Sequence, residues 1–557
     1  MRMGASTLGV IVAVAGLVGC AASHKPGGEP DDPTPLALSI NTPARGTTVD
    51  GGTVAVTGSV TGGSGVYSVT VNGIAAPVGT DGSFAATLSS LPDGIDVITT
   101  VATDASGDSQ EDDRAVLLGT LAASDGTHTA PLAAHASPAA LTAIANAIAG
   151  EAAKVDYTAA AQALNPVYNN GGCLGAVVNI DSVSLSGVDV ALTPQNGSLA
   201  AAVTINNVSV KLTANFEVAC IGGSGTITVS ASAAHITGNL TASVASGKIA
   251  TALPTTNVTL DNFNLSVSGI PSEITGLFDG IIQGKVQSAL ASAIQSKVPG
   301  IANTELNSLL AQPVSDTLLG AAITIGVTPT TASVATDGLF VAVDTTVSVA
   351  GGSGGEFLTE PTTSAQPLLA AQPDLGVAVA NDVVNQLFAG LWAAGAFDQT
   401  VQISSIPALG ALLDSSATQL ALKLSLPPTA ATDANGDLDL ALGDAMVSVE
   451  DASGTQLQQI ALSLSTGLAV TNGSGTITMT LGTPTVHAQV TQQATDGTPP
   501  LSATEISGLV TGAWSLVGTE AQSALAKLPL PSVAGVSVGD PTLDSASNYV
   551  VADIPIH

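Results

Sequence analysis

Long runs in which apolar and polar residues alternate constrain the fold of this chain more than any other feature of its sequence. One run places an apolar residue at every second position: Val208, Val210, Leu212, Ala214, Phe216 and Val218. A later run does the same with Leu420, Leu422, Leu424 and Leu426. Successive side chains of a β-strand point to opposite faces, so each run predicts a strand with one apolar face. These faces must be covered, and we expect sheets that pack against other elements.

Composition narrows the class of protein. Of the 557 residues, 45% are hydrophobic and only 10% are charged, whereas roughly 25% is typical of soluble domains. Such a chain is not expected to be disordered along its length, because disordered segments are poor in apolar groups. The formal net charge is -32, from 43 acidic and 11 basic residues. We expect no nucleic-acid partner, since phosphate binding needs clustered Lys and Arg.

The first 20 residues predict export and lipid attachment. Residues 1–19 have the pattern of a signal peptide, and their apolar run is shorter than the roughly 20 residues that span a bilayer. Leu17-Val18-Gly19-Cys20 then resembles the bacterial lipobox, in which the Cys carries acyl chains such as palmitate and becomes the mature N-terminus. Two or more acyl chains give stable anchoring. The alternative is an ordinary secretory signal in which Cys20 occurs by chance.

The residues after Cys20 indicate where the protein is held. Ala21 and Ala22 follow with no Asp beside the Cys, which favours the outer membrane of the cell envelope by the usual sorting rule. Whether the protein faces the periplasm or the cell surface stays open. Residues 20–35 are rich in Pro, Gly and acids and predict a tether that has nothing to bury.

Residues 36–119 are predicted to form an all-β sandwich. Short alternating strands are separated by turns of Gly, Pro, Asn and Asp, a pattern typical of antiparallel sandwiches. With Val71-Asn72-Gly73 and Asp81-Gly82-Ser83-Phe84, the segment resembles bacterial immunoglobulin-like modules. Residues 120–136 predict a linker.

From residue 137 onwards the sequence repeats one plan twice: an apolar helix, alternating strands, a second apolar helix and closing strands. In the first copy, Ile270-Pro271-Ser272-Glu273 predicts the start of a long helix and Pro299-Gly300 its end. Residues 351–366 predict a linker, and the second copy is expected to open with a helix over residues 377–397.

Four local matches connect residues 137–557 to a known family. Asp337-Gly338-Leu339-Phe340 resembles a strand that ends the family's first domain, and residues 382–395 look like the helix that opens its second. Leu528-Pro529-Leu530-Pro531 looks like its C-terminal segment, and the order of helices and strands is the fourth match. The segment therefore resembles the bactericidal/permeability-increasing protein-like superfamily, also called the tubular lipid-binding (TULIP) superfamily.

The resemblance implies an α+β fold. Two tandem tubular lipid-binding domains, residues 137–350 and 367–557, would each have a highly curved antiparallel sheet around a long helix, after the all-β immunoglobulin-like sandwich. Apolar helix residues would line the tubes. The candidate lipid-binding residues are Ile144, Ile148, Leu277, Ile281, Leu290, Ile294, Leu387, Phe388, Leu391, Trp392, Leu509 and Ala513. For any one of them, ordinary core packing is the alternative.

The resemblance also implies a disulfide between Cys173 and Cys220. They are the only Cys residues besides Cys20, in a chain predicted to be exported, although their placement differs from the family pattern. A second departure concerns charge. Family members that bind lipopolysaccharide present basic tips, whereas residues 351–557 contain only Lys423 and Lys527 as bases.

No catalytic or metal-binding motif stands out. There is no Gly-x-Ser-x-Gly elbow with plausible partners and no phosphate-binding loop, so we expect neither an enzyme nor a cofactor. The acids at 111–113 and at 433–439 lack a full set of calcium ligands and are expected to be solvated turns.

Two functions fit these patterns. The first is a membrane-anchored bacterial lipoprotein that binds or transfers lipid acyl chains in apolar tubes, with phospholipid or another acyl lipid as its partner. The second is an adhesive or structural surface lipoprotein with no lipid cargo. The sequence indicates neither the identity of the lipid nor any protein partner.

Overall fold

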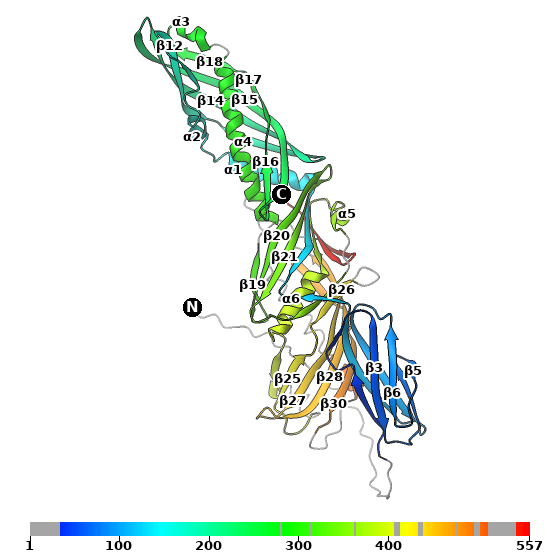
Figure 1. Cartoon of the computed structure of the whole chain (residues 1–557). Coiled ribbons are helices and arrows are strands. Elements are labelled where there is room, and N and C mark those ends of the chain that lie inside the picture. Colours follow the sequence, from blue (N-terminus) through cyan, green and yellow to red (C-terminus); the bar gives the residue numbers. More distant parts are fainter. Residues whose placement is uncertain are drawn as a thin grey trace.

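The structure is a computed structural model that describes residues 34–278, 281–310, 313–360, 364–405, 413–432, 438–473, 476–494, 502–508, 510 and 542–556. The predicted signal peptide, Cys20, the acidic loop at 433–437 and the 528–531 segment lie outside these residues. Strands account for 57% of the described residues and helices for 18%. The molecule is elongated, with a β-sandwich at one end and a helix-covered sheet at the other (Figure 1).

Two sheets form the N-terminal sandwich. One has the order β1-β3-β6, with β1 (Ala37–Thr42), β3 (Thr53–Thr61) and β6 (Ser83–Ser89). The other has the order β2-β8-β7-β4-β5, with β2 (Thr47–Val49), β8 (Ser109–Leu118), β7 (Gly94–Asp104), β4 (Tyr67–Val71) and β5 (Ile74–Ala76). Val56, Val71 and Val116 are fully buried in the core between them, as the alternating pattern predicts.

The next unit, which we call the first half-barrel, is a sheet built on two very long strands. Its order is β11-β12-β14-β15-β16, with β13 paired to β14 and with β17 and β18 paired to β15. The strands are β11 (Tyr168–Asn170), β12 (Leu174–Ser184), β13 (Gly187–Gln195), β14 (Ser198–Val218), β15 (Ile221–Ala245), β16 (Lys248–Ala252), β17 (Thr256–Asp261) and β18 (Asn264–Ser268). Four helices accompany the sheet: α1 (Pro138–Ala152), α2 (Tyr157–Gln162), α3 (Ser272–Phe278) and α4 (Ile281–Leu310).

A central sheet joins early and late parts of the chain. Its order is β19-β20-β21-β10-β23-β32-β31. The strands are β19 (Val314–Leu318), β20 (Ala321–Ala335), β21 (Gly338–Val349), β10 (Thr127–Ala136), β23 (Leu375–Ala380), β32 (Tyr549–Ile554) and β31 (Thr542–Ala546). Beside it, β9 (Thr120–Ala123) pairs with β22 (Glu356–Thr359), and the short helix α5 spans Gln366–Leu369.

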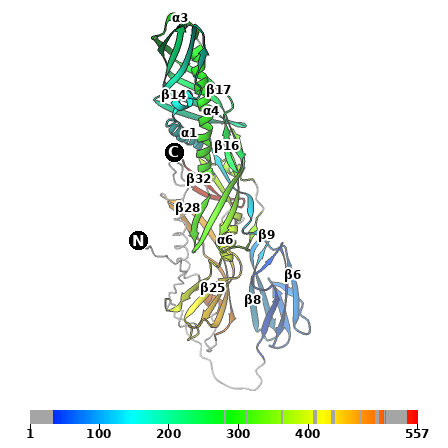
Figure 2. The same ribbon diagram turned by 60° about the vertical axis from the view of Figure 1, so that its left-hand side comes forward.

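The second half-barrel is a seven-stranded sheet accompanied by the helix α6 (Asn381–Ala393). Its path is β24-β25-β27-β28-β29, with β26 paired to β27 and β30 paired to β28. The strands are β24 (Gln399–Gln402), β25 (Gln419–Leu424), β26 (Thr429–Thr432), β27 (Leu438–Glu450), β28 (Gln456–Gly473), β29 (Thr476–Leu481) and β30 (Thr485–Gln492); a 3-10 turn covers Ile403–Ser405. Figure 2 shows this sheet beside the sandwich, far from the first half-barrel.

These elements correct the predicted fold class. An α+β fold of two tandem tubular domains, each with a curved sheet around a long helix, is wrong, because the described chain is mostly β and its sheets are open half-barrels. Strands from both predicted copies also share the central sheet. Within the described residues, the helical segments beside the second half-barrel are the 13-residue α6 and a stretch at residues 503–508. Alternation therefore dominates this chain, and the helices accompany sheets that remain open.

Two predicted helix boundaries are also wrong. α4 does not end before Pro299 but continues through it to Leu310. Proline removes one backbone hydrogen bond from a helix, and here Asn303 and Asn307, beyond Pro299, hold the helix against β16. The second correction concerns Val377, which lies in strand β23, so the helix begins only at Asn381.

The sandwich is docked on the second half-barrel through one edge of β8. β8 pairs with β7 along its length but with β2 only at residues 116–118, and the described residues supply no partner strand for 111–115. Side chains take that place. The Ala115 N–H donates to the Asp444 carboxylate (3.2 Å) and the Asp113 N–H donates to the Gln489 amide oxygen (3.2 Å). Arg45 donates to Asp444 (2.6 Å) and to the Asp113 carbonyl (2.7 Å).

Charge at this interface responds to pH. Burial raises the pKa of Asp444, against the attraction of Arg45. A hydrogen bond to Asp113 raises the pKa of His487, whose Nδ1 lies 3.5 Å from the carboxylate. A His with a raised folded-state pKa contributes stability that is fully present below its unfolded pKa of about 6.5 and is lost as the pH rises through the folded value. His487 therefore strengthens docking in mild acid.

Asp444→Ala is expected to loosen the docked sandwich. The Ala115 amide loses its acceptor and Arg45 loses a buried partner, and breaking a buried pair typically costs about 3–5 kcal/mol. Hydrogen–deuterium exchange should become faster at Ala115 while the core amides of the sandwich keep their protection. Asp398→Ala changes an exposed Asp and serves as the control. Unchanged exchange at Ala115 would contradict this account of the interface.

Candidate functional site

The inward face of the first half-barrel is apolar from its buried middle to its open end. The registers of β12, β14 and β15 align the inward residues into rungs. From the middle outwards, the rungs are Ile180–Leu212–Ile227, Val178–Ala214–Gly225, Ala176–Phe216–Gly223 and Leu174–Val218–Ile221. The first rung is buried, whereas Leu174 and Ile221 are 54% and 75% exposed. An apolar track thus runs from the surface into the core.

Helices α1 and α4 cover the buried part of this track. α1 begins at Ser137, whose hydroxyl accepts a hydrogen bond from the Ala140 N–H (3.2 Å), as in an N-cap. Apolar residues three or four positions apart then form one buried face on each helix: Leu141, Ile144 and Ile148 on α1, and Val286, Leu290 and Ile294 on α4. Both faces belong to one continuous apolar core with the sheet.

One edge of the sheet is closed by amide side chains of α4. Gln287 Nε2 donates to the Val258 carbonyl of β17 (3.1 Å). Asn307 bonds to both backbone groups of Ile249 in β16, at 2.9 and 2.7 Å, and Asn303 accepts from the Thr251 N–H. Unpaired backbone groups at a sheet edge must find partners, and here a helix supplies them in place of a strand.

Helix α2 closes the opposite edge. β11 pairs with β12 only as far as Val178, and β12 is bulged between Ile180 and Ser182. Three polar side chains from residues 157–165 bond to the freed backbone of β12: Thr158, Gln162 and Asn165. Both edges of the half-barrel are therefore sealed by side chains, on one side by α4 and on the other by this short segment.

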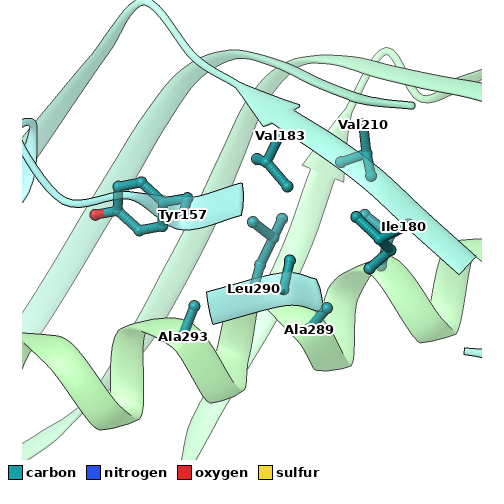
Figure 3. Close-up of a pocket in the computed structure, with 9 residues that line it drawn as sticks. Tyr157, Ile180, Val183, Val210, Ala289, Leu290 and Ala293 are labelled. Carbon is teal, nitrogen blue, oxygen red and sulfur yellow. The ribbon is translucent and has the colours of Figure 1, made fainter. Parts of the chain in front are cut away.

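A small apolar cavity lies between α2, α4 and the sheet. Its lining residues are Tyr157, Ala161, Ile180, Val183, Val210, Val286, Ala289, Leu290 and Ala293. Figure 3 shows Leu290 and Ala293 of α4 facing the side chains of β12 across this space. The volume is about 10 Å³, room for roughly one water molecule. The interior is therefore closed in this conformation, and a larger ligand enters only if its cover moves.

Tyr157 is the polar exception in the lining. Burial raises the pKa of its hydroxyl, which donates to the Ala152 carbonyl at the end of α1 (3.1 Å). The hydroxyl is therefore satisfied by α1, and the ring presents an apolar surface to the cavity.

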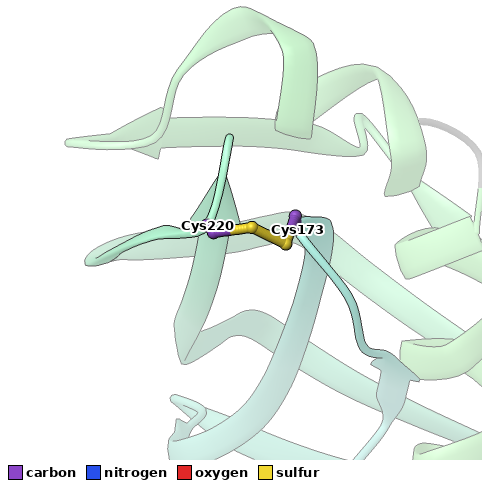
Figure 4. The surroundings of a disulfide bond; sticks show 2 residues. All are labelled: Cys173 and Cys220. Atoms are coloured by element: carbon purple, nitrogen blue, oxygen red, sulfur yellow. A yellow bond between two sulfur atoms is a disulfide. The ribbon is translucent and has the colours of Figure 1, made fainter.

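At the open end of the half-barrel a disulfide joins Cys173 and Cys220 (Figure 4), which confirms the predicted pair. It ties the residue before β12 to the turn between β14 and β15. A shallow recess of about 300 Å³ lies beside it. Glycines 171, 172, 175, 222 and 223 form much of its wall, together with the side chains of Asn170, Asn215 and Glu217. Ala176, Val177 and Phe216 add apolar surface to the recess, Glu217 is the one charged residue in its lining, and the lining contains no Lys or Arg.

The predicted lipid-binding residues fall in different places. Ile144, Ile148, Leu290 and Ile294 lie in the core of the first half-barrel, and Leu290 lines the cavity. Ile281 is 41% exposed at the start of α4, and the side chain of Leu277, in α3, lies outside the described residues. Leu387, Phe388, Leu391 and Trp392 lie on α6, beside the second half-barrel, where Leu391 is fully buried and Trp392 Nε1 donates to the Leu424 carbonyl (2.8 Å). Leu509 and Ala513 lie outside the described residues.

Sequence reasoning missed most of the cavity lining. Ala161, Ala289 and Ala293 are small residues on helices, and nothing in a helical repeat separates a cavity-lining Ala from a packed one. Ile180, Val183 and Val210 alternate like any core strand residue. Their common feature is the closeness of two helices to one bulged strand, which only the structure shows.

Two polar features of the described residues have structural partners, the acids at 111–113 and His235. The acids at 111–113 do not form the expected solvated turn but lie in strand β8, where they take part in docking the sandwich. His235 is half-buried and lies between Thr204 (3.2 Å) and Asp261 (3.1 Å). Within the ranges given above, no group of three or more His, Cys, Asp or Glu side chains could hold a metal ion. None of the helices in those ranges is long and apolar enough to cross a membrane.

Comparisons with known proteins give one family match and two distant structural similarities. Residues 36–120 match the family model of glucodextranase, domain B, which supports the immunoglobulin-like prediction for this segment. No curated protein matches the chain. The crystal structure of lipopolysaccharide binding protein aligns with 12% identity and a TM-score of 0.41 over 77% of this chain and 99% of that chain. The solution structure of latherin aligns with 17% identity and a TM-score of 0.20 over 32% of this chain and 86% of that chain.

Removing the disulfide should destabilise the open end of the first half-barrel. The bond spans 47 residues, and loop-closure models assign such a link about 4 kcal/mol. For Cys173→Ser/Cys220→Ser we expect a lower urea midpoint for unfolding than for the oxidised wild-type chain. Wild-type chain treated with reductant is the matched control and should shift by the same amount. Free thiols at both positions in exported protein, or equal midpoints, would contradict the prediction.

Proposed function

We propose that the protein binds acyl chains of a phospholipid or another acyl lipid inside the first half-barrel. The observation that carries the proposal is the apolar track, which begins at the exposed residues Leu174 and Ile221 and ends at a buried cavity beside Leu290. An acyl chain gains about 0.8 kcal/mol for each methylene it buries. Such a track needs no precisely placed polar group in order to bind strongly.

Charge favours some lipids over others. The chain carries a net charge of -32, and the recess at the open end presents Glu217 with no basic residue in its lining. Anionic head groups are repelled by such a surface at low salt. The proposed ligands are therefore neutral or zwitterionic acyl lipids, not lipids recognised through their phosphates by basic residues.

We further propose that the protein is a lipoprotein of the cell envelope, anchored through Cys20 and held at the outer membrane. The chain enters the sandwich at the start of β1, and the far end of β1 leads to Arg45 at the docking interface. The sandwich and the open end of the first half-barrel lie at opposite ends of the molecule (Figure 1). An anchor before residue 36 would then leave the apolar opening pointing away from its own membrane. Transfer of lipid to a second membrane or carrier is compatible with this arrangement.

One observation favours a second function. The cavity is no larger than one water molecule, as in the packed interior of a module that only supports others. A structural or adhesive surface lipoprotein without cargo would have such an interior. The expectation that the chain is not an enzyme stays a prediction under both functions.

Lipid uptake separates the two functions. Ala293→Leu places a larger side chain in the cavity and should lower the uptake of a zwitterionic probe, phosphatidylcholine with a fluorescent parinaroyl chain, several-fold. Ala389→Leu makes the same change at a buried helix position outside the cavity. Overpacking costs about 1–3 kcal/mol at either site, so both variants should lose a similar amount of melting temperature. If only Ala293→Leu also loses uptake of the probe, the result supports lipid binding. A wild-type chain that takes up no probe supports the structural function.

Cys20→Ser should release the protein from membranes. The change removes the sulfur that would carry the glyceryl acyl chains, and a single remaining acyl chain gives only marginal, reversible binding. Fractionation of cells should find the variant in the soluble fraction and the wild type in the membrane fraction. If Cys20→Ser stays with membranes and mass spectrometry of the wild-type N-terminus finds no lipid, the anchoring proposal is wrong.

A further inference from the structure

The helices around the cavity differ in how much apolar contact holds them in place. α1 buries eight of its residues, and α4 belongs to the same continuous core. By contrast, α2 has six residues, of which only Tyr157 and Ala161 are buried. Both of these line the cavity. The segment 157–165, which we call the strap, is therefore the part of the cover with the least apolar contact.

Side-chain hydrogen bonds hold the strap in place. Thr158 Oγ1 donates to the Val183 carbonyl (3.1 Å) and accepts from the Val183 N–H (2.9 Å). Asn165 bonds in the same way to both backbone groups of Ile180, at 2.9 and 2.7 Å. Gln162 Nε2 donates to the Asp181 carbonyl (2.6 Å). Three side chains thus make five hydrogen bonds with the backbone of three residues at the β12 edge, Ile180, Asp181 and Val183.

The bulge in β12 makes this latch reversible. Between Ile180 and Ser182 the register of the β12–β14 pair shifts, which turns the backbone of these residues towards the strap. If the strap lifts, the same backbone groups stand at an open edge that water can reach, so they exchange protein partners for water. A net hydrogen bond of this kind is weak, so a short segment held mainly by five of them can open locally while the rest of the half-barrel stays folded.

Lifting the strap would open the cavity from the side. Ile180 and Val183 of β12 line the cavity on one side, and Val286, Ala289 and Leu290 of α4 line it on the other. With Tyr157 and Ala161 removed, the space between β12 and α4 would become a groove along the helix. The β16 and β17 edge offers no such opening, because α4 itself is bound there through Gln287, Asn303 and Asn307.

We propose that the strap is a lateral gate: it lifts from the β12 edge to admit an unbranched acyl chain beside α4, and it closes again through Thr158, Gln162 and Asn165. This inference rests on the proposed lipid binding. If the acyl chain enters and leaves through the same gate, opening of the gate controls both the uptake rate and the release rate. A change in the gate then alters both rates by a similar factor and leaves the affinity almost unchanged. A residue that binds the ligand would instead change the affinity.

The kinetics with which the full chain binds phosphatidylcholine carrying a fluorescent parinaroyl chain test the gate. Thr158→Val/Gln162→Leu removes three of the five hydrogen bonds, and each net bond lost changes an opening equilibrium by roughly fivefold. Uptake and release should both become at least tenfold faster, with the dissociation constant within a factor of about two of the wild type. Thr241→Val removes a similar exposed Thr-to-carbonyl bond on the β15–β16 hairpin (Thr241 Oγ1 to Ala252, 3.3 Å) and should change neither rate.

If the wild type binds the probe but Thr158→Val/Gln162→Leu leaves both rates unchanged, or changes only the affinity, the gate is overturned while lipid binding survives. A wild type that binds no probe overturns the proposed function. Hydrogen–deuterium exchange of the wild type tests the gate even then, and also if the variant fails to fold. The Ile180 and Val183 amides, which donate to the strap, should exchange at least tenfold faster than amides shared between β14 and β15. Equally slow exchange at all of them would show a strap that does not lift.

Discussion

Backbone groups at the edges of apolar sheets need partners, and this constraint shapes two sheets of the described chain, that of the first half-barrel and that of the sandwich which contains β8. β14 and β15 run for 21 and 25 residues inside the sheet of the first half-barrel. The strands that flank them, β12 on one side and β16 and β17 on the other, could pair with other chains unless their free edges were covered. The chain seals its edges with side chains. Asn303 and Asn307 close one edge of the first half-barrel, the strap closes the other, and Asp444 with Gln489 closes the edge of β8. The same solution therefore shapes the candidate site and docks the sandwich.

This form of closure has a functional consequence. A strand added to an edge contributes a continuous ladder of backbone bonds, whereas a helix with a few amides contributes separate bonds that can break independently. The two covers of the first half-barrel differ in how firmly they are held, because α4 is a 30-residue helix packed into the core and the strap contains only the six-residue α2. An apolar interior enclosed by covers of unequal strength can stay closed in water and still admit an apolar ligand. That property, more than the size of the cavity in the closed state, is what connects this structure to lipid binding.

Much of the fold could be predicted from residues alone, and the failures have a common cause. Alternation located the strands around Val210 and Leu422, and the helical faces of α1 and α4 followed from apolar spacing. The prediction of the fold class was wrong because the sequence pattern does not show which strands share a sheet. β10, for example, pairs with both β21 and β23, which lie far from it in the sequence. The predicted end of α4 was wrong because Pro299 is only a local signal. Asn303 and Asn307 bind a strand some 50 residues away and hold the helix in place beyond Pro299. The contacts of the strap could not be predicted for the same reason, because they depend on a bulge in β12.

The central claim, that the first half-barrel holds acyl lipid, is tested most directly by the cargo of the native protein. Full-length protein would be purified from its own membranes, and native mass spectrometry would be combined with analysis of extracted lipid. The account predicts a neutral or zwitterionic acyl lipid bound non-covalently, in near-stoichiometric amount and in addition to any chains attached to Cys20. It also predicts that this lipid protects the Ile180 and Val183 amides from exchange. Protein that carries no lipid beyond a covalent anchor, with an interior that stays closed to added acyl chains, would contradict the claim and leave a purely structural lipoprotein.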